Sequence, residues 1–154
     1  MTPLLKSLRY LTRALVEFDG PPHLAAGFAL GLAVGLIPKT SLLAKLGLVA
    51  ISAVKVNMAA AYLAMTAASA LAPLADPLAH AVGHLLLVKA AFLKPLWTRA
   101  YNMPIVPWTG FYNTVTLGWT VLGAALAYPA YRVSLPIIER HKKDWAERLR
   151  RVKR

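Results

Sequence analysis

The chain has 154 residues, of which 58% are hydrophobic and 16% are charged, and it carries a formal net charge of +12 at pH 7. Its mean hydropathy of +0.52 is too high for an ordinary soluble domain of this size, so the composition predicts an integral membrane protein and argues against a basic nucleic-acid-binding protein. Because the sequence contains no cysteine, it excludes a disulfide framework, a thiol nucleophile and a metal held by cysteine.

Residues 1–19 predict an amphipathic helix that begins near Pro3 and ends before the Gly20-Pro21 turn. One apolar stripe is formed by Leu4, Leu8, Leu11, Leu15 and Phe18. The other side carries Lys6, Arg9 and Arg13. Such a helix either lies in the membrane interface or packs on the rest of the protein, and the sequence leaves both readings open. A secretory signal peptide is not expected, because the strongly apolar sequence starts only after this segment.

The apolar run over residues 23–38 makes a helix of about 22 Å, whereas a bilayer core needs about 30 Å. It is therefore too short to span alone. Pro38 ends this helix and leaves the carbonyls of its last turn without partners, and Lys39 is placed to bind them and the negative end of the helix dipole. Thr40 or Ser41 then caps a second short helix that runs to about residue 56.

Together these two short helices predict a re-entrant hairpin, because broken backbone is tolerated at membrane depth only where protein covers it or where it lines a wet cavity. Two ordinary helices joined at the headgroup level are the alternative. A candidate polar crevice for an anionic lipid headgroup is formed by Lys39, Ser41, Lys45, Ser52 and Lys55. Snorkelling of these lysines to the interface is the competing interpretation. Tight packing of the hairpin on a neighbouring helix is assigned to Gly27, Gly31, Gly35 and Pro38.

Residues 57–72 and 77–94 predict two further helices, with Pro73 ending the first and Pro95 ending the second. Asp76, directly before a proline, is interpreted as the cap of the second helix. The stretch 97–108 contains too many prolines for a helix, so it predicts an extended connection at the membrane interface.

Residues 109–131 predict the clearest membrane crossing, about 30 Å long. Its two ends are marked by aromatic residues, which are typical of membrane interfaces: Trp108, Phe111, Tyr112, Tyr128 and Tyr131. Gly110, Thr114 and Gly118 repeat the four-residue spacing of small side chains. This crossing is therefore predicted to offer a packing partner for the glycine-rich hairpin.

A last, basic and amphipathic helix is predicted from about Leu135 and should rest on the cytoplasmic leaflet. Eight Lys and Arg against three acidic residues in 138–154 place the C-terminus inside, and the basic residues near the N-terminus agree. We thus expect an all-α polytopic bundle divided into segments 1–19, 20–136 and 137–154. If 57–73, 77–94 and 109–131 all crossed, the termini would lie on opposite faces, so 77–94 is predicted to be re-entrant or interfacial.

Polar residues in the apolar runs are the candidates for chemistry. Asp76, His80 and His84 recur every four residues, a spacing compatible with a zinc ligand set, with a proton-linked Asp76/His80 pair, or with a cap and satisfied histidines. Helix caps are the favoured role of Asn57, Asn102 and Asn113, and interhelical hydrogen bonding is the alternative. No phosphate loop, nucleophile elbow, zinc-protease motif or paired-carboxylate motif occurs, so the sequence predicts no enzyme activity and no cofactor.

The segments PPHLAAGFALGLAVGLIPKTSLL, KVN, DPLAH, LW and YNMPIVPWTGFYNT, in this order, resemble a small bacterial integral-membrane family related to domain of unknown function 2062. The resemblance extends from about Pro21 to Pro136. The family's usual Phe-Asn-Asn-Thr reads Phe-Tyr-Asn-Thr here, at residues 111–114, and His84 lies outside the pattern. The resemblance implies an inner-membrane protein, often encoded beside a larger envelope protein similar to AsmA-like lipid bridges.

The sequence thus predicts a non-enzymatic, multi-pass protein of the bacterial inner membrane with both termini cytoplasmic, which anchors a larger envelope partner or hands lipid to it. A small homo-oligomeric transporter of a solute or ion is one alternative, with its site at the broken helices. A metal-dependent membrane hydrolase using Asp76, His80 and His84 is the second.

Overall fold

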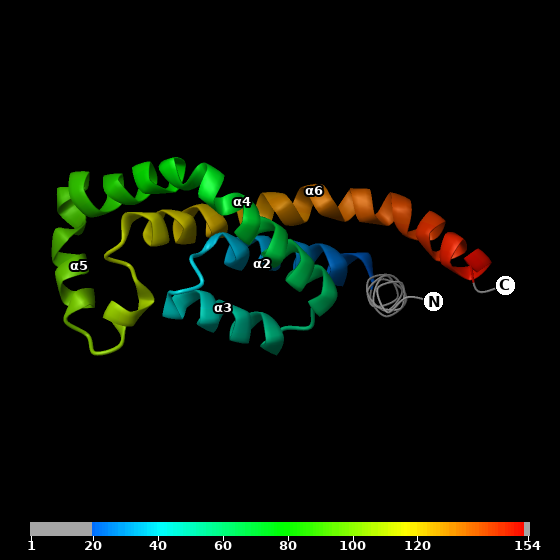
Figure 1. Ribbon diagram of the computed structural model, residues 1–154, viewed down its shortest axis with the longest axis horizontal. Helices are drawn as coiled ribbons and strands as arrows, with labels where there is room; N and C mark the ends of the chain where they lie inside the picture. Colours follow the sequence, from blue (N-terminus) through cyan, green and yellow to red (C-terminus); the bar gives the residue numbers. More distant parts are fainter. Residues whose placement is uncertain (1–19, 153–154) are drawn as a thin grey trace.

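The computed structural model describes the backbone of residues 20–152 and the side chains of residues 20–141. The first predicted helix, over residues 1–19, lies outside the described part of the chain. Every regular element in the described part is helical, which confirms the predicted all-α class. The longest elements, α4 and α6, run in opposite directions, with α2 packed against both (Figure 1).

The chain reverses between α2 (Pro21–Leu36) and α3 (Leu42–Ala53). Proline in the first turn favours the start of α2, and Ile37 leaves the helical region with ψ 133 because it precedes Pro38. Ser41, rather than Thr40, caps α3, because its side chain accepts a hydrogen bond from the Ala44 N–H at 3.2 Å. From this turn α3 runs back towards the end where α2 begins (Figure 1).

Helix α4 (Met58–His84) is continuous, so the prediction of two helices separated at Pro73 and Asp76 is wrong. Both Pro73 and Pro77 lie inside it. Proline removes one backbone hydrogen bond and bends a helix, but it does not end a helix that neighbouring elements hold in place. A π-helical turn, η1 (Leu85–Lys89), extends α4.

Short helices occupy most of the stretch 97–108, which was predicted to be extended. They are α5 (Lys94–Tyr101) and η3 (Val106–Thr109), and the short helix η2 (Ala91–Leu93) precedes α5. Pro95 lies in the first turn of α5, where its missing N–H costs nothing, instead of ending the preceding helix. These elements form the end of the molecule farthest from the start of α2 (Figure 1).

Helix α6 (Thr114–Val152) also runs through two prolines, Pro129 and Pro136. A separate helix from about Leu135 is therefore not found, and the predicted boundary between residues 136 and 137 falls inside α6. The end of α6 and the start of α2 lie at the same end of the molecule, opposite α5 (Figure 1).

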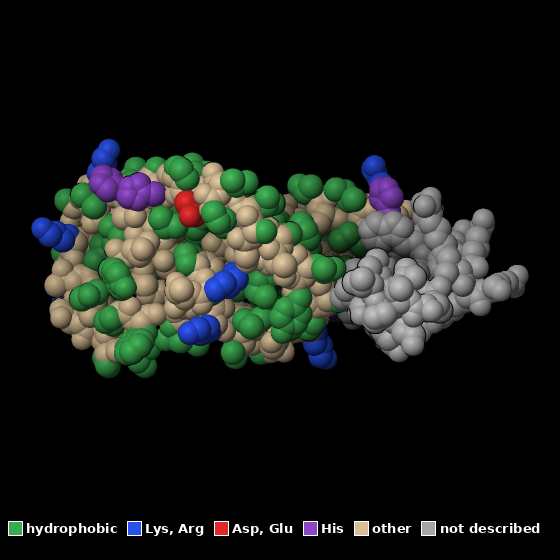
Figure 2. All heavy atoms as spheres, viewed as in Figure 1, with side chains coloured by type: hydrophobic (Ala, Val, Ile, Leu, Met, Phe, Trp, Pro, Cys, Tyr) green, Lys and Arg blue, Asp and Glu red, His purple; other side chains and the backbone are tan. Residues whose placement is uncertain are grey.

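Among the residues that the structure describes, two helical stretches are long and apolar enough to cross a membrane: Met58–Lys89, with 32 residues, and Thr114–His141, with 28. Helices α2 and α3 are apolar but shorter. Large apolar side chains on the outside are frequent, as for Leu74 and Phe92, which are each 81% exposed. Hydrophobic side chains are spread along the described part of the visible face, with few charged groups among them (Figure 2).

Small residues let the three main helices approach closely. A Cβ atom on Gly27 or Gly31 would overlap a backbone carbonyl oxygen of α4, and one on Gly35 would lie 2.7 Å from the Met65 oxygen. The glycine face of α2 therefore packs on α4, not on α6 as predicted. On α6, Gly118 meets the backbone of α4 at Ala79. A satellite core cluster of Ala72, Ala79 and Trp119 joins α4 to α6.

Candidate functional site

The turn after α2 is held by the side chain of Lys39. Its Nζ donates hydrogen bonds to the backbone oxygens of Gly35 at 2.9 Å, Ile37 at 3.1 Å and Val34 at 3.2 Å. An ammonium group has three N–H donors, so all of them are used on the last turn of the helix. Lys39 thus satisfies carbonyls that a helix end leaves without partners, as its position in the sequence predicts.

Helix α4 adds polar side chains to the same place. The hydroxyl of Ser69 lies 3.0 Å from the Gly35 oxygen and 2.6 Å from the Met65 oxygen, so its single proton is shared between two carbonyls. About two turns further along α4, the Asp76 Oδ1 accepts a hydrogen bond from the indole N–H of Trp119 at 2.7 Å. Asp76 is therefore not a helix cap, because α4 is continuous there, and its partner comes from α6.

These groups surround a small pocket of about 160 Å³, which we call the Lys39 pocket. Its lining residues are Gly35, Leu36, Ile37, Pro38, Lys39, Ser69, Ala72, Pro73 and Asp76. Pro73 and Pro77 have no N–H, so the carbonyls of Ser69 and Pro73 lack the usual donor four residues later. The residues that line the pocket thus include two whose carbonyls lack this donor, together with the cationic side chain of Lys39 and the carboxylate of Asp76.

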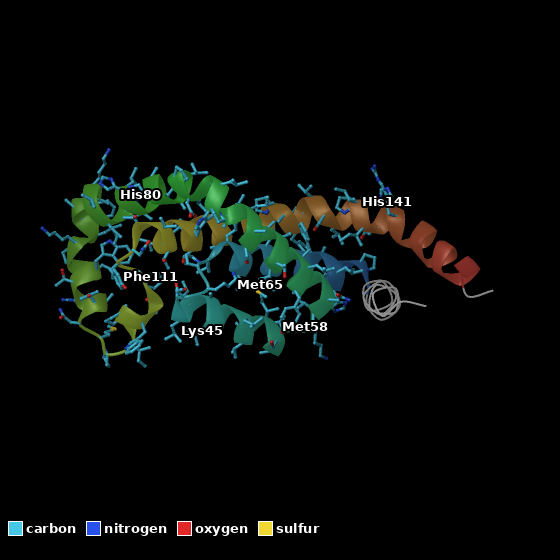
Figure 3. All side chains as sticks on the ribbon, in the orientation of Figure 1. Lys45, Met58, Met65, His80, Phe111 and His141 are labelled. Carbon is cyan, nitrogen blue, oxygen red and sulfur yellow. The ribbon has the colours of Figure 1, made fainter. Side chains whose placement is uncertain are left out.

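The other four residues of the predicted crevice do not line this pocket. Ser41 is buried and caps α3, and the Ser52 hydroxyl donates to the Leu48 oxygen of its own helix. Lys45 and Lys55 are exposed. Figure 3 shows Lys45 on α3, a different helix from Met65 on α4. The structure thus keeps Lys39 in the candidate site and assigns its polar neighbours to α4 instead of α3.

The histidines lie towards the α5 end of α4. His80 Nδ1 is 2.6 Å from the Thr114 hydroxyl oxygen, and the rings of His80 and His84 are 5.9 Å apart. Asp76 is turned to Trp119. Over the described residues, no group of three or more His, Asp or Glu side chains is arranged to hold a metal ion. The His80 contact ties the start of α6 to α4.

The three asparagines lie at helix ends. Asn57 accepts a hydrogen bond from the Ala60 N–H at 2.8 Å at the start of α4, and Asn113 accepts from the N–H groups of Val115 and Thr116 at the start of α6. Asn102 follows α5, and its amide donates to the Thr98 oxygen. Gly110, just before Asn113, has a φ of +75, a left-handed conformation that glycine adopts without strain.

Sequence reasoning missed Ser69 and Trp119 as members of the site. Each belongs to a contact between residues far apart in the chain, 34 positions for Ser69 and Gly35 and 43 for Trp119 and Asp76. The available signal was weak. Ser69 is a polar residue in an alanine-rich run, and it lies four residues before Pro73, the spacing at which proline frees a carbonyl.

Comparisons with known proteins place the chain in a family without assigning it a function. The family described as uncharacterized proteins conserved in bacteria, DUF2062, matches residues 5–146. A relative from Treponema pallidum (strain Nichols), described as an uncharacterized protein, is 29% identical over 131 residues, which is 85% of this chain and 80% of the relative. No solved structure matches the chain. The family match includes the Lys39 pocket and both long helices.

Proposed function

The chain belongs to the bacterial DUF2062 family, and on that premise we propose that it is a non-enzymatic, multi-pass protein of the inner membrane that handles lipid for a larger envelope protein. The observation that carries the proposal is the Lys39 pocket, in which the last turn of α2 is satisfied by Lys39 and Ser69 beside the middle of a long apolar helix. A membrane protein maintains such a polar site at a cost, which makes function the default interpretation.

The depth of the pocket follows from the lengths of the helices. Helix α2 starts level with α4, because the Asn57 N–H donates to the His23 oxygen at 3.0 Å. Its 16 residues extend about 24 Å from that level, against a hydrocarbon core of about 30 Å. The tip contacts α4 between Met65 and Asp76, well inside the 32-residue apolar stretch. This geometry supports a re-entrant α2–α3 hairpin.

Lipid handling follows from what such a pocket offers. A phospholipid that leaves the plane of the bilayer must bring its polar headgroup into a region without water, and it needs hydrogen-bonding partners there. The Lys39 pocket supplies backbone oxygens, a hydroxyl and a carboxylate at that depth. The family resemblance adds the second half of the proposal, an AsmA-like envelope partner that receives the lipid.

Depth measurement tests the re-entrant hairpin. Since the chain has no cysteine, Thr40→Cys and Val54→Cys each give a single attachment site for a nitroxide label, and both positions are exposed. In bilayers, Thr40 at the tip should be reached by oxygen in preference to a water-soluble nickel complex, and Val54 at the exit of the hairpin should show the reverse. A label at Thr40 that reports the depth of the phosphates would reject the re-entrant hairpin.

Co-purification tests the partner. Extraction from the membranes of the source bacterium in mild detergent should retain a large envelope protein and phospholipid with the chain. Reconstitution of the pure protein alone into liposomes is the opposing experiment. Gradient-driven flux of an ion or solute without a partner would favour the transporter hypothesis, in which broken helices near the midplane form the site.

A further inference from the structure

The chemistry of the Lys39 pocket selects the charge of its ligand. The end of α2 presents carbonyl oxygens and the negative end of its dipole. Pro73 lacks the N–H that would bond to the Ser69 carbonyl, and Pro77 lacks the one that would bond to the Pro73 carbonyl. Ser69 and Pro73 both line the pocket, and Asp76 adds a carboxylate. Such a set attracts cations that donate hydrogen bonds, and it repels a phosphate group.

The resident cation is Lys39 itself. Its ammonium makes three hydrogen bonds of 2.9–3.2 Å to carbonyls, which demonstrates that the end of α2 fits a primary ammonium group. With all three N–H groups in use, Lys39 is poorly placed to bind an anionic headgroup as well. The anionic lipid expected from the sequence therefore does not match the polarity of the pocket.

We propose that the Lys39 pocket is a primary-ammonium site, occupied by Lys39 at rest and by the ethanolamine headgroup of a phospholipid when Lys39 moves out. Lys39 lies at the pocket, is exposed and has a flexible stem, so it is able to leave. Replacing one ammonium by another conserves the charge and the hydrogen bonds of the pocket, and the displaced Lys39 ammonium can pair with the phosphate of the same headgroup. The lipid half of this assignment rests on the proposed function, whereas the ammonium site does not.

Chemical rescue tests the ammonium site. Lys39→Met keeps the length of the side chain but removes the ammonium, so the purified variant should melt at a lower temperature than the native protein. Methylammonium chloride should restore most of the lost melting temperature, whereas tetramethylammonium chloride, which has no N–H donor, should not. Lys45→Met is the matched control, because Lys45 is an exposed lysine outside the pocket, and it should show neither the loss nor the rescue. Equal effects of the two salts, or none, would overturn the site.

Two further experiments identify which cation the pocket binds. If potassium chloride rescues Lys39→Met as well as methylammonium does, the ligand is an alkali ion and the headgroup assignment is overturned. In nanodiscs, Lys39→Met should retain phosphatidylethanolamine more strongly than native protein, with no change for phosphatidylcholine of the same acyl chains. Rescue by methylammonium without this selectivity would overturn the lipid assignment while the ammonium site stands.

A second variant keeps the proposal testable if Lys39→Met does not fold. Asp76→Asn retains an oxygen that accepts from Trp119 but removes the negative charge from the pocket. Retention of phosphatidylethanolamine should fall in this variant, whereas retention of phosphatidylcholine with the same acyl chains should not change. Unchanged retention would contradict the ammonium site. The depth measurement at Thr40 is independent of all these results, so a failure of the re-entrant hairpin is distinguishable from a failure of the ammonium site.

Discussion

Trp119 and Asp76 form a polar contact in the interface between α4 and α6. Trp119 is 4% exposed, and its indole N–H donates to Asp76 at 2.7 Å. Trp119→Phe keeps an aromatic ring but removes the N–H donor and part of the buried ring volume, so the variant should lose about 1–3 kcal/mol of unfolding free energy. Reversible unfolding in detergent micelles measures the loss.

Trp108→Phe is the control for that variant, because Trp108 is 75% exposed and should lose almost nothing. Asp76→Leu should be as costly as Trp119→Phe, since it leaves the indole N–H without an acceptor. If Trp119→Phe and Trp108→Phe are equally stable, the hydrogen bond to Asp76 contributes nothing measurable and the contact is only apolar packing.

The close approach of α2 and α4 depends on the absence of a Cβ atom at glycine positions such as Gly31. A Cβ on Gly31 would overlap the backbone oxygen of Ala61, and a backbone atom is not able to turn away as a flexible side chain does. Gly31→Ala should therefore separate the helices and cost about 1–3 kcal/mol, read as a lower melting temperature. At Gly20 the nearest atoms to an added Cβ are 3.5 Å away, so Gly20→Ala should not destabilise. A neutral Gly31→Ala would contradict the observed packing.

At the scale of single residues, the sequence predicts contacts between residues that are close together in the chain. Lys39 could be assigned to the carbonyls of α2 because they lie within five residues of it, and the four-residue spacing of Gly27, Gly31 and Gly35 predicts one small face. Which helix meets that face depends on contacts across more than 30 residues, for which a single sequence gives no rule. The expected partner was α6, and the structure gives α4.

At the scale of whole helices, a proline does not always mark the end of a helix. Pro38 ends α2, whereas Pro73, Pro77, Pro129 and Pro136 lie inside longer helices. The missing N–H and the steric restriction are the same in each case, so the difference lies in the surroundings. After Pro38 the chain turns, with Lys39 and Ser41 satisfying the two helix ends, whereas α4 is held on both sides of Pro73 by contacts with α2 and α6.

Helix caps were easier to predict, and Asn57 offers a test at the scale of one element. It is 2% exposed and its side chain accepts from the first turn of α4. Asn57→Ala should cost about 0.5–2 kcal/mol through loss of this cap. Asn102→Ala, at an exposed site after α5, should change stability less. Denaturation of both variants in the same micelles compares them, and equal losses would remove the special role of the buried cap.

At the scale of the whole molecule, the number of long apolar helices differs from the predicted number. Three crossings would put the two ends of the chain on opposite faces, but 58–72 and the first part of 77–94, up to His84, belong to the single helix α4, which leaves two long helices in the described part. The start of α2 and the end of α6 lie at one end of the molecule (Figure 1). The predicted number of crossings therefore depended on whether a proline interrupts a helix.

Charge predicts which end faces the cytoplasm. Residues 138–154 contain eight Lys and Arg, whereas the end formed by α5 has Lys89, Lys94 and Arg99 and exposed aromatic side chains such as Trp108. We therefore expect Arg140→Cys to react with a membrane-impermeant maleimide only after the inner membrane is permeabilised. Met103→Cys, which is exposed between α5 and η3, should react in intact spheroplasts. The reverse pattern would invert the orientation, and labelling of both from one side would mean that α4 and α6 do not both cross.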